Sequence, residues 1–439
     1  MEVLTQAAQL ILSLSILVIL HELGHFIPAK LFKTRVEKFY LFMDPWFSLF
    51  KIKRGDTEFG IGWLPIGGYV KISGMIDESM DKEQMKLPPQ PWEFRSKPTW
   101  QRLIIMVGGV TVNLILGVLI YAMVLFAWGE EYLPTANVKY GIACDSLALN
   151  MGFKNGDKIL SVDNNPVENF NKIPLEIILN NAKSVQVDRE GQRIEIPVKE
   201  EVLSQLIKGK NTLFEPLFPC EVDSVMEATP AREAGLMKGD KIVAIDSVQT
   251  LFFQDIAKNL YLNKGKKIQL KINRNGEEKI LNSDVTEEGK LGFIVRDKYK
   301  YFDLVTREYG FFESFPAGIQ KGYDTFDNYI KQMKFLFTVK DAHKSLGGFI
   351  AIGKAYSTSW DWPRFWTFTA FLSIVLAIMN ILPIPALDGG HVMFLLYEMI
   401  TRRKPNEKAM EYAQYAGMML LLALLLYANG NDIVRIFSK

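Results

Sequence analysis

The stretch His21-Glu-Leu-Gly-His25 ends a hydrophobic segment and decides how the rest of the chain is interpreted. Upstream, from Ala7 to Leu20, the segment holds only apolar residues, two serines and a glutamine. Ionisable groups at bilayer depth are unfavourable, so their presence indicates a functional site. On a helix, His21 and His25 lie on one face, where both imidazoles can reach one metal ion. Glu22 lies beside them as a base for a hydrolytic water, which predicts a zinc hydrolase in or at the edge of a membrane.

Length and composition predict a membrane protein of several domains without a nucleic-acid partner. The chain has 439 residues, 49% of them hydrophobic, and a net charge of +2. The apolar residues cluster in four segments that are candidate membrane helices, at about 4–28, 103–128, 365–387 and 412–428. The last segment is short and could instead be a buried helix. The first lacks a basic leading region and a cleavage site, so we expect it in the mature protein.

Basic residues near the ends of these segments predict the orientation in the membrane. If the helices alternate, three basic clusters fall on one side, which the positive-inside rule makes cytoplasmic. They are Lys30, Lys33, Arg35 and Lys38; Arg95, Lys97 and Arg102; and Arg402, Arg403 and Lys404. Both termini and residues 129–364 then lie outside, in the periplasm if the cell is a bacterium. The His21 motif lies toward the cytoplasmic side of what would be the inner membrane.

Residues 39–75 form a connection that is too apolar for an ordinary cytoplasmic loop. Residues 57–72 predict a β-hairpin, with two short strands around the turn Leu64-Pro-Ile-Gly-Gly68. At membrane depth, its unpaired edges must be covered by protein or line a wet cavity. An edge beside a protease site can pair with an extended substrate. A surface hairpin that does not touch the site is the alternative interpretation.

An internal repeat divides the region from 129 to 300, which has little membrane character. Gly152–Asp163 aligns with Gly235–Asp246 through a shared Gly-Asp-Lys-Ile and a final Asp. This resembles a tandem pair of PDZ domains, at 129–214 and 215–300. Such domains bind peptides by adding a strand to a sheet edge; here they could instead only exclude bulky proteins from the membrane site. Two cysteines in this region are either paired or free, and neither has metal-ligand spacing: Cys144 and Cys220.

The segment 301–364 is expected to be interfacial. Apolar residues recur there at helical spacing and predict an amphipathic helix on the membrane or on the PDZ-like pair: Phe315, Ile319, Tyr323 and Phe326. Tryptophans precede the third apolar segment, as in an aromatic belt at the membrane interface: Trp360, Trp362 and Trp366.

Asp388 is the second ionisable group at the end of an apolar run, in Asn380-Ile-Leu-Pro-Ile-Pro-Ala-Leu-Asp-Gly-Gly-His391. A catalytic zinc usually has three protein ligands and a water. Asp388, on the same side of the membrane, supplies the oxygen ligand that is missing from His21 and His25. The alternative is that Asp388 caps a helix in a cytoplasmic turn. His391, three residues on, is a rival ligand or a partner of one.

These two motifs, His-Glu-Leu-Gly-His in the first segment and Asn-x-x-Pro-x-Pro-x-Leu-Asp-Gly-Gly in the third, resemble the site-2 protease family of intramembrane zinc metalloproteases. Four spans, an early hairpin and a PDZ-like pair between the second and third spans resemble its bacterial RseP type, the regulator of sigma-E protease. The resemblance covers nearly the whole chain. It implies an α-helical membrane protein whose two membrane halves, 1–128 and 365–439, flank the inserted α+β domains.

The resemblance also implies roles for individual residues. Those that bind zinc would be His21, His25 and Asp388, and the base that activates water would be Glu22. The residues that hold the substrate backbone would be Asn380 in the third span, and Gly67 and Gly68 in the hairpin. The substrate would be a single-span membrane protein, an anti-sigma factor or a signal-peptide remnant, cut in or near its helix within the lipid bilayer.

Two other classes of protein explain less of the chain. A metal transporter would need ionisable residues along several spans, and the centres of the second and fourth segments have none. A metal-binding scaffold that recruits partners through its PDZ-like pair explains the repeat, but not Glu22 beside two ligands. In the second segment, Gly108, Gly109 and Gly117 are expected to let helices approach closely. Asn113 there matches a family element only loosely.

Overall fold

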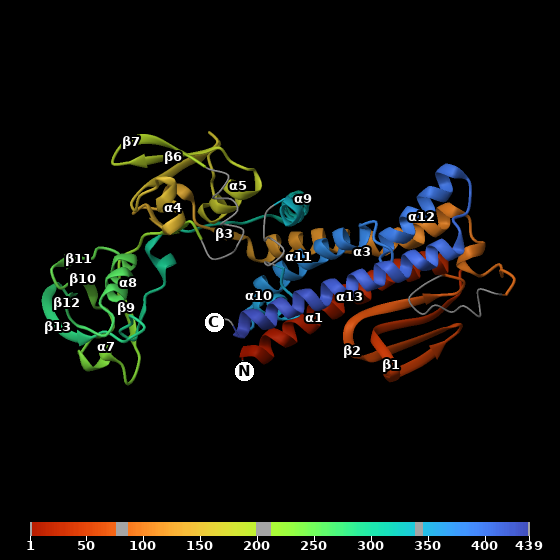
Figure 1. The fold of residues 1–439 in the computed structure, drawn as a ribbon, viewed down its shortest axis with the longest axis horizontal. Coiled ribbons are helices and arrows are strands. Elements are labelled where there is room, and N and C mark those ends of the chain that lie inside the picture. Colours follow the sequence, from red (N-terminus) through yellow and green to blue (C-terminus); the bar gives the residue numbers. More distant parts are fainter. Residues whose placement is uncertain (1, 76–86, 199–211, 339–345, 438–439) are drawn as a thin grey trace. The chain divides into compact units, whose positions relative to one another are not determined.

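The computed structural model describes residues 2–75, 87–198, 212–338 and 346–437 (Figure 1). The chain forms two compact units. The first is built from the chain up to Gly129, from Glu308–Leu336 and from Leu346 onward. The second is built mainly from Glu130–Arg307, so it separates two halves of the first unit in the sequence.

Four helices of the first unit are long and apolar enough to cross a membrane, which confirms the expected number of candidate spans in the described chain. They are α1 (Glu2–Leu31), α3 (Thr99–Trp128), α11 (Trp362–Ile381) and α13 (Glu407–Phe437). Pro98 directly precedes α3. Asp361 caps α11, because its side chain accepts a hydrogen bond from the backbone N–H of Arg364 at 3.0 Å. Apolar run length therefore identifies the spans, and local capping sets where they begin.

The chain after the third span differs from the prediction. The apolar run reaches residue 387, but α11 ends at Ile381, because Pro383 and Pro385 cannot continue a helix. A further helix, α12 (Asp388–Thr401), follows the break and was not predicted. The last candidate span covers Lys408–Val434, and only 11% of its most apolar stretch is buried inside the protein, so the interpretation of this segment as a buried helix is wrong.

Polar side chains connect the spans in the interior of the first unit. Thr369 of α11 donates a hydrogen bond to Ser13 Oγ of α1 at 3.0 Å, and both residues are fully buried. Ser373, one turn further along α11, donates to the backbone carbonyl of Asn113 in α3 at 2.7 Å. Such interhelical hydrogen bonds hold membrane helices together where no hydrophobic force acts between them.

Two long strands, β1 (Val36–Arg54) and β2 (Thr57–Ile72), follow α1. The predicted hairpin is wrong in its pairing, because its two arms do not pair with each other in the described chain. Lys38 is the partner of Glu58 on one side and of Lys71 on the other, so the first part of β1 lies between the two arms. The later part of β1 pairs with residues 57–62.

The predicted amphipathic helix is present as α9 (Phe311–Thr338), and α10 (Phe349–Ala355) follows it. Gly318 and Gly322 of α9 face α3, since a Cβ on either would meet Ala122 or Val118. The apolar residues that predicted the helix are exposed: Phe315, Ile319, Tyr323 and Phe326. The helix therefore packs on a span and leaves apolar side chains exposed, as expected of an element in contact with lipid.

The second unit consists of short strands and helices. They are β3 (Glu130–Tyr132), β4 (Ile142–Cys144), α4 (Ser146–Met151), β5 (Lys158–Val162), α5 (Ile173–Leu179), β6 (Ser184–Arg189), β7 (Gln192–Pro197), β8 (Phe214–Pro216), β9 (Val222–Val225), α7 (Pro230–Glu233), β10 (Lys241–Ile245), β11 (Val248–Gln249), α8 (Phe253–Leu262), β12 (Lys267–Arg274), β13 (Glu277–Asp284), β14 (Phe293–Val295) and β15 (Val305–Arg307). One hydrophobic core includes Ile142 and Val185, beside the sheet β5-β6-β7. A second includes Ile242 and Leu270, beside the sheet β11-β10-β12-β13.

The internal repeat appears as one hydrogen-bond pattern that is made twice in the second unit. In the first copy, Arg189 donates to both oxygens of the buried Asp157 at 2.7 Å, and to the carbonyl of Gly152 at 2.9 Å. In the second copy, Arg274 donates to both oxygens of Asp240 at 2.7 Å and to the carbonyl of Gly235 at 2.8 Å. A buried carboxylate held by a two-pronged guanidinium fixes the turn before a strand in each copy.

Candidate metal centre

His21 and His25 lie on one face of α1, as their spacing predicts. Their rings meet edge to face, with centroids 4.9 Å apart, and their Nε2 atoms are 3.3 Å apart. His25 is buried and His21 is half-buried at the same face of the helix. Two ring nitrogens are therefore held close together on neighbouring turns, away from bulk solvent.

Asp388 reaches these histidines because the chain breaks after α11. Ala386 takes a positive φ of 81° in the break, and Asp388 is the first residue of α12. The glycines that follow it permit the close return of the chain. A Cβ on Gly389 would lie 2.1 Å from the carbonyl oxygen of Leu382, so only glycine fits there. The proline pair and the glycine pair together turn an aspartate from the end of one span toward another span.

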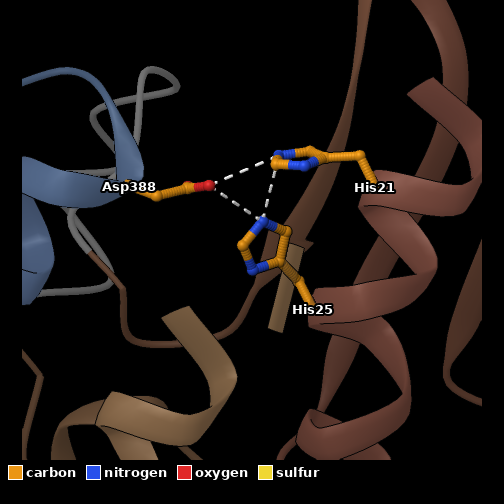
Figure 2. A group of neighbouring side chains, drawn as sticks. All are labelled: His21, His25 and Asp388. Atoms are coloured by element: carbon orange, nitrogen blue, oxygen red, sulfur yellow. Dashed lines mark hydrogen bonds and ion pairs between the residues drawn. The ribbon is translucent and has the colours of Figure 1, made fainter. Parts of the chain in front are cut away.

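The three side chains converge on one point, as Figure 2 shows. Asp388 Oδ2 lies 3.3 Å from Nε2 of His21 and 3.3 Å from Nε2 of His25. In a tetrahedral zinc site with bonds of about 2.0–2.1 Å, donor atoms are about 3.3 Å apart. Asp388 Oδ2 is buried and has no hydrogen-bond partner within the described chain. Two nitrogens, one oxygen and this spacing fit a zinc ion.

The outer nitrogen of His25 has a partner that suits metal binding. His25 Nδ1 lies 2.8 Å from the backbone carbonyl oxygen of Ile105 in α3. A carbonyl only accepts, so the ring carries its proton on Nδ1 and presents the lone pair of Nε2 to the metal point. Ring orientation through such an outer hydrogen bond is the usual arrangement for a histidine that binds metal.

Glycines allow α1 and α3 to cross at the metal point. A Cβ on Gly24 of α1 would lie 2.5 Å from the carbonyl oxygen of Gly108, so the two backbones touch. A Cβ on Gly109 would lie 2.3 Å from His25 Nε2 and 2.6 Å from His21 Cε1. The expected close approach of helices at Gly108 and Gly109 is confirmed, and Gly109 also leaves the space that the two imidazoles occupy.

Comparison with known proteins agrees with this geometry. The family described as Peptidase family M50 matches residues 9–424. The chain belongs to peptidase family M50, the site-2 protease family. It is 27% identical to the regulator of sigma-E protease of Haemophilus influenzae, over 99% of this chain and 100% of that protein. It is also 27% identical to the regulator of sigma-E protease RseP of Escherichia coli K12, over 98% of each. This M50 chain is a membrane metalloprotease, and zinc is the metal of its family.

A cavity of about 790 Å³ opens beside the metal point of this M50 protease. Glu22 lines it together with His21, His25 and Asp388, and Gly68 of β2 is also part of its lining. Gly67 precedes Gly68 at the turn, with a φ of 71°. Asn380 is also brought to the site, since its Nδ2 lies 3.3 Å from His21 Nε2. The cavity is thus lined by predicted residues of α1, β2 and α12, and Asn380 of α11 joins them through His21, whereas the exposed Gly67 is not among the lining residues.

His391 also lines the cavity, but the three converging donor groups include Asp388 and not His391. A second cavity of about 160 Å³ shares His391 and Met75 with the first. The two cysteines lie elsewhere, in the second unit, and both are free thiols.

A polar cluster in the cavity wall was missed by sequence reasoning. Tyr69 of β2 donates a hydrogen bond to Asp44 Oδ1 at 2.7 Å, and Lys38 Nζ lies 3.7 Å from Asp44 Oδ2. Burial, and then the hydrogen bond to Asp44, raise the pKa of Tyr69 above its ordinary value. All three residues line the cavity. The only signal in the sequence is local: Asp44 is the one charged residue between Phe39 and Phe50.

Proposed function

We propose that this protease cleaves single-span membrane proteins within or near their transmembrane helix. In this proposal His21, His25 and Asp388 bind the zinc ion, and Glu22 is the catalytic base. The observation that carries the proposal is the triangle of donor atoms, each 3.3 Å from the others, at the wall of a cavity that Glu22 also lines. The helix that carries His21 and Glu22 is itself a candidate membrane span.

When bound, zinc polarises a substrate carbonyl and makes water a better nucleophile at neutral pH. Glu22 follows His21 directly in α1, and its carboxylate takes the proton that water loses on attack. The same carboxyl group then gives a proton to the amine that leaves. A single group can serve first as base and then as acid if it stays within hydrogen-bond reach of the reacting atoms. The cavity that Glu22 and the histidines line gives the hydrolytic water a route to the reacting atoms.

The substrate helix has to unwind, because each of its backbone carbonyls is occupied by a hydrogen bond within the helix. Residues 68–72 of β2 offer replacement partners. In the described chain they pair with the first part of β1 on one side only, and they line the cavity. An extended substrate segment can add to such an edge. Asn380, beside His21, is placed to hold a substrate carbonyl or N–H with its amide.

We propose that the metal site faces the cytoplasmic side of the inner membrane and that the second unit faces the periplasm. The basic residues near the ends of α1, α3 and α12 support this orientation. We also propose that the second unit is a pair of PDZ-like domains, at 129–214 and 215–300. The repeated Asp–Arg pattern and the two separate cores support a duplicated module. These domains either bind peptide ends or keep bulky proteins away from the site.

The substrates that we propose are an anti-sigma factor and remnants of signal peptides. Relatives over the whole chain are named regulators of sigma-E protease, which supports the first. A single-span protein or a peptide remnant has one helix to unwind, and the edge of β2 can accept that segment in extended form. The domain pair would admit such substrates more readily than large folded ones.

The test uses the purified full-length protein in vesicles with a single-span reporter. Glu22→Gln should lower cleavage about 10²–10⁴-fold, the range for loss of a general base, and should leave the zinc content unchanged. Glu2→Gln, at the exposed start of the same helix, is the matched control and should cleave normally. A chelator should stop the wild-type protein, and added zinc should restore it. Cleavage by Glu22→Gln at the wild-type rate would remove Glu22 from the reaction.

A further inference from the structure

We propose that Asn113 of α3 is a positioning residue, which holds the His21 ring in the orientation and tautomer that metal binding requires. The inference rests on the proposed ligand set, in which His21 binds zinc through Nε2. Asn113 is fully buried in the middle of a candidate membrane span. Burial of an amide in that environment is unfavourable unless its polar atoms have hydrogen-bond partners, so a polar side chain there indicates a functional role.

The partner of the Asn113 amide is the outer nitrogen of His21. Asn113 Nδ2 lies 3.1 Å from His21 Nδ1, and Asn113 Oδ1 is buried without a hydrogen-bond partner within the described chain. The amide group thus contacts His21 at one end only. A side chain buried for general packing would not need an amide, since leucine has a similar shape and no polar atoms to satisfy.

Metal binding determines which end of the amide faces the ring. If His21 offers its Nε2 lone pair to zinc, then Nδ1 carries the proton and becomes a donor. An amide N–H cannot face a ring N–H, so the carboxamide oxygen of Asn113 has to face Nδ1. The oxygen and nitrogen of an amide have nearly the same shape, so a half-turn of the group places Oδ1 at the same position. Asn113 then accepts from His21.

The pattern along α3 supports this assignment. Ile105, Gly109 and Asn113 are spaced four residues apart, so they lie on one face of the helix. Ile105 supplies the carbonyl that accepts from His25 Nδ1, and Gly109 leaves room for both rings. Asn113 occupies the corresponding position beyond Gly109, against His21. One face of α3 therefore orients both histidines, through a backbone carbonyl for one and a side chain for the other.

Matched variants distinguish a positioning role of Asn113 toward His21 from a role in helix packing alone. Asn113→Leu removes the acceptor but keeps the approximate shape. Asn113→Asp keeps an oxygen that accepts from His21, as in the carboxylate–histidine–zinc arrangement. Ser373→Ala removes the hydrogen bond to the Asn113 backbone carbonyl and leaves the amide in place, so it tests helix attachment alone.

The measurement is zinc affinity of the purified full-length protein, by competition with a chelator of known affinity. We expect Asn113→Leu to weaken zinc binding about 10–100-fold, the range for loss of an outer partner of a ligand. Asn113→Asp should recover most of that loss, and Ser373→Ala should bind as the wild type does. With cobalt as a probe, Asn113→Leu should also change the visible absorption bands of the bound ion, which a change in packing elsewhere would not.

Two outcomes would overturn the inference. If Asn113→Leu binds zinc as tightly as the wild type while His21→Ala loses it, the ligand set stands and Asn113 has no positioning role. If Asn113→Asp is as weak as Asn113→Leu, the lost property is amide packing and not an acceptor for His21. Failure of the proposed function is separately visible, because His21→Ala would then keep its zinc.

Discussion

Buried aspartates occur in both units, and their surroundings differ. Asp240, in the second unit, is fully buried and receives two hydrogen bonds of 2.7 Å from Arg274. Asp388, in the first unit, faces two imidazole nitrogens at 3.3 Å, and its Oδ2 has no hydrogen-bond partner within the described chain. One carboxylate is neutralised and fully hydrogen-bonded by the protein itself. The other is one of three lone-pair donors that point at a shared position.

The difference separates a structural charge from a functional one. A buried ion pair with complete hydrogen bonds is stable in place, and its loss is a matter of folding. A cluster of lone-pair donors without protons between them is unfavourable alone and becomes favourable when a cation binds. The pattern of Asp240 is repeated at Asp157, as expected of a fold element that was duplicated. The pattern of Asp388 is formed only where α12 begins, within the described residues.

The largest expected effect comes from Asp388→Ala. It removes one of three proposed ligands, and the two histidines alone should not retain zinc through purification. We expect metal analysis of the purified protein to find zinc at background level, and reporter cleavage to be lost. Asp303→Ala, at an exposed position of the second unit, is the control and should keep its zinc. Full zinc occupancy in Asp388→Ala would exclude this aspartate from the site.

At the ion pair of Arg274 with Asp240, we expect a loss of stability without a loss of zinc. Arg274→Met leaves Asp240 buried without its partner, which should destabilise the surrounding strands by about 3–5 kcal/mol. Hydrogen exchange of the full-length protein should show this loss at β10 and β12, while β5 and β6 exchange as before. Arg189→Met should reverse the pattern, because it disturbs the first copy alone. Zinc content should stay constant in both variants, and a loss of zinc would mean that the two kinds of buried charge are coupled.

A smaller effect is expected at the crossing of α1 and α3. Gly109→Ala places a methyl group in steric conflict with the ring of His25, since the Cβ would be 2.3 Å from Nε2. The rings have to move apart, and zinc affinity should fall about 10–100-fold, as when the surroundings of a ligand are disturbed. Gly430→Ala in α13 is the control, because a Cβ there meets nothing within 4 Å. Equal zinc affinity in the two variants would show that α3 yields easily and that Gly109 is not needed for the site.

The sequence alone predicts the parts of the molecule that have a local signal. Run length identifies the four candidate spans, and ionisable residues inside apolar runs identify His21, His25 and Asp388, which the structure brings together. Strand pairing has no such signal, because Lys38 acquires two partners, Glu58 and Lys71, only when distant segments meet. The predicted hairpin was wrong for that reason.

Neutral residues at the site are also difficult to predict. Asn113 is uncharged and lies in an apolar run, so nothing local distinguishes it from a residue that joins helices. Its relation to His21 depends on how α1 crosses α3, which the sequence does not state. The wall formed by Lys38, Asp44 and Tyr69 depends in the same way on the register of β1 with β2. Contacts between elements, and not residue types, determine these parts of the site.

The smallest effect is expected at the cysteines, of which Cys220 is buried and Cys144 half-buried. Thiols can bind metal, but within the described residues neither lies in a group of metal-ligating side chains. Burial raises the pKa of Cys220 to about 12; burial, and then the nearby Asp157 and Asp145, raise that of Cys144 to about 12. Because the pKa is raised, both thiols stay protonated at neutral pH, and the reactive thiolate increases about tenfold per pH unit up to about pH 12. Alkylation by iodoacetamide at pH 7.5 should therefore be slow in the folded protein and fast in denaturant. Replacing both cysteines by serine should change neither zinc content nor cleavage, and rapid labelling of the native protein would show that burial does not protect these thiols.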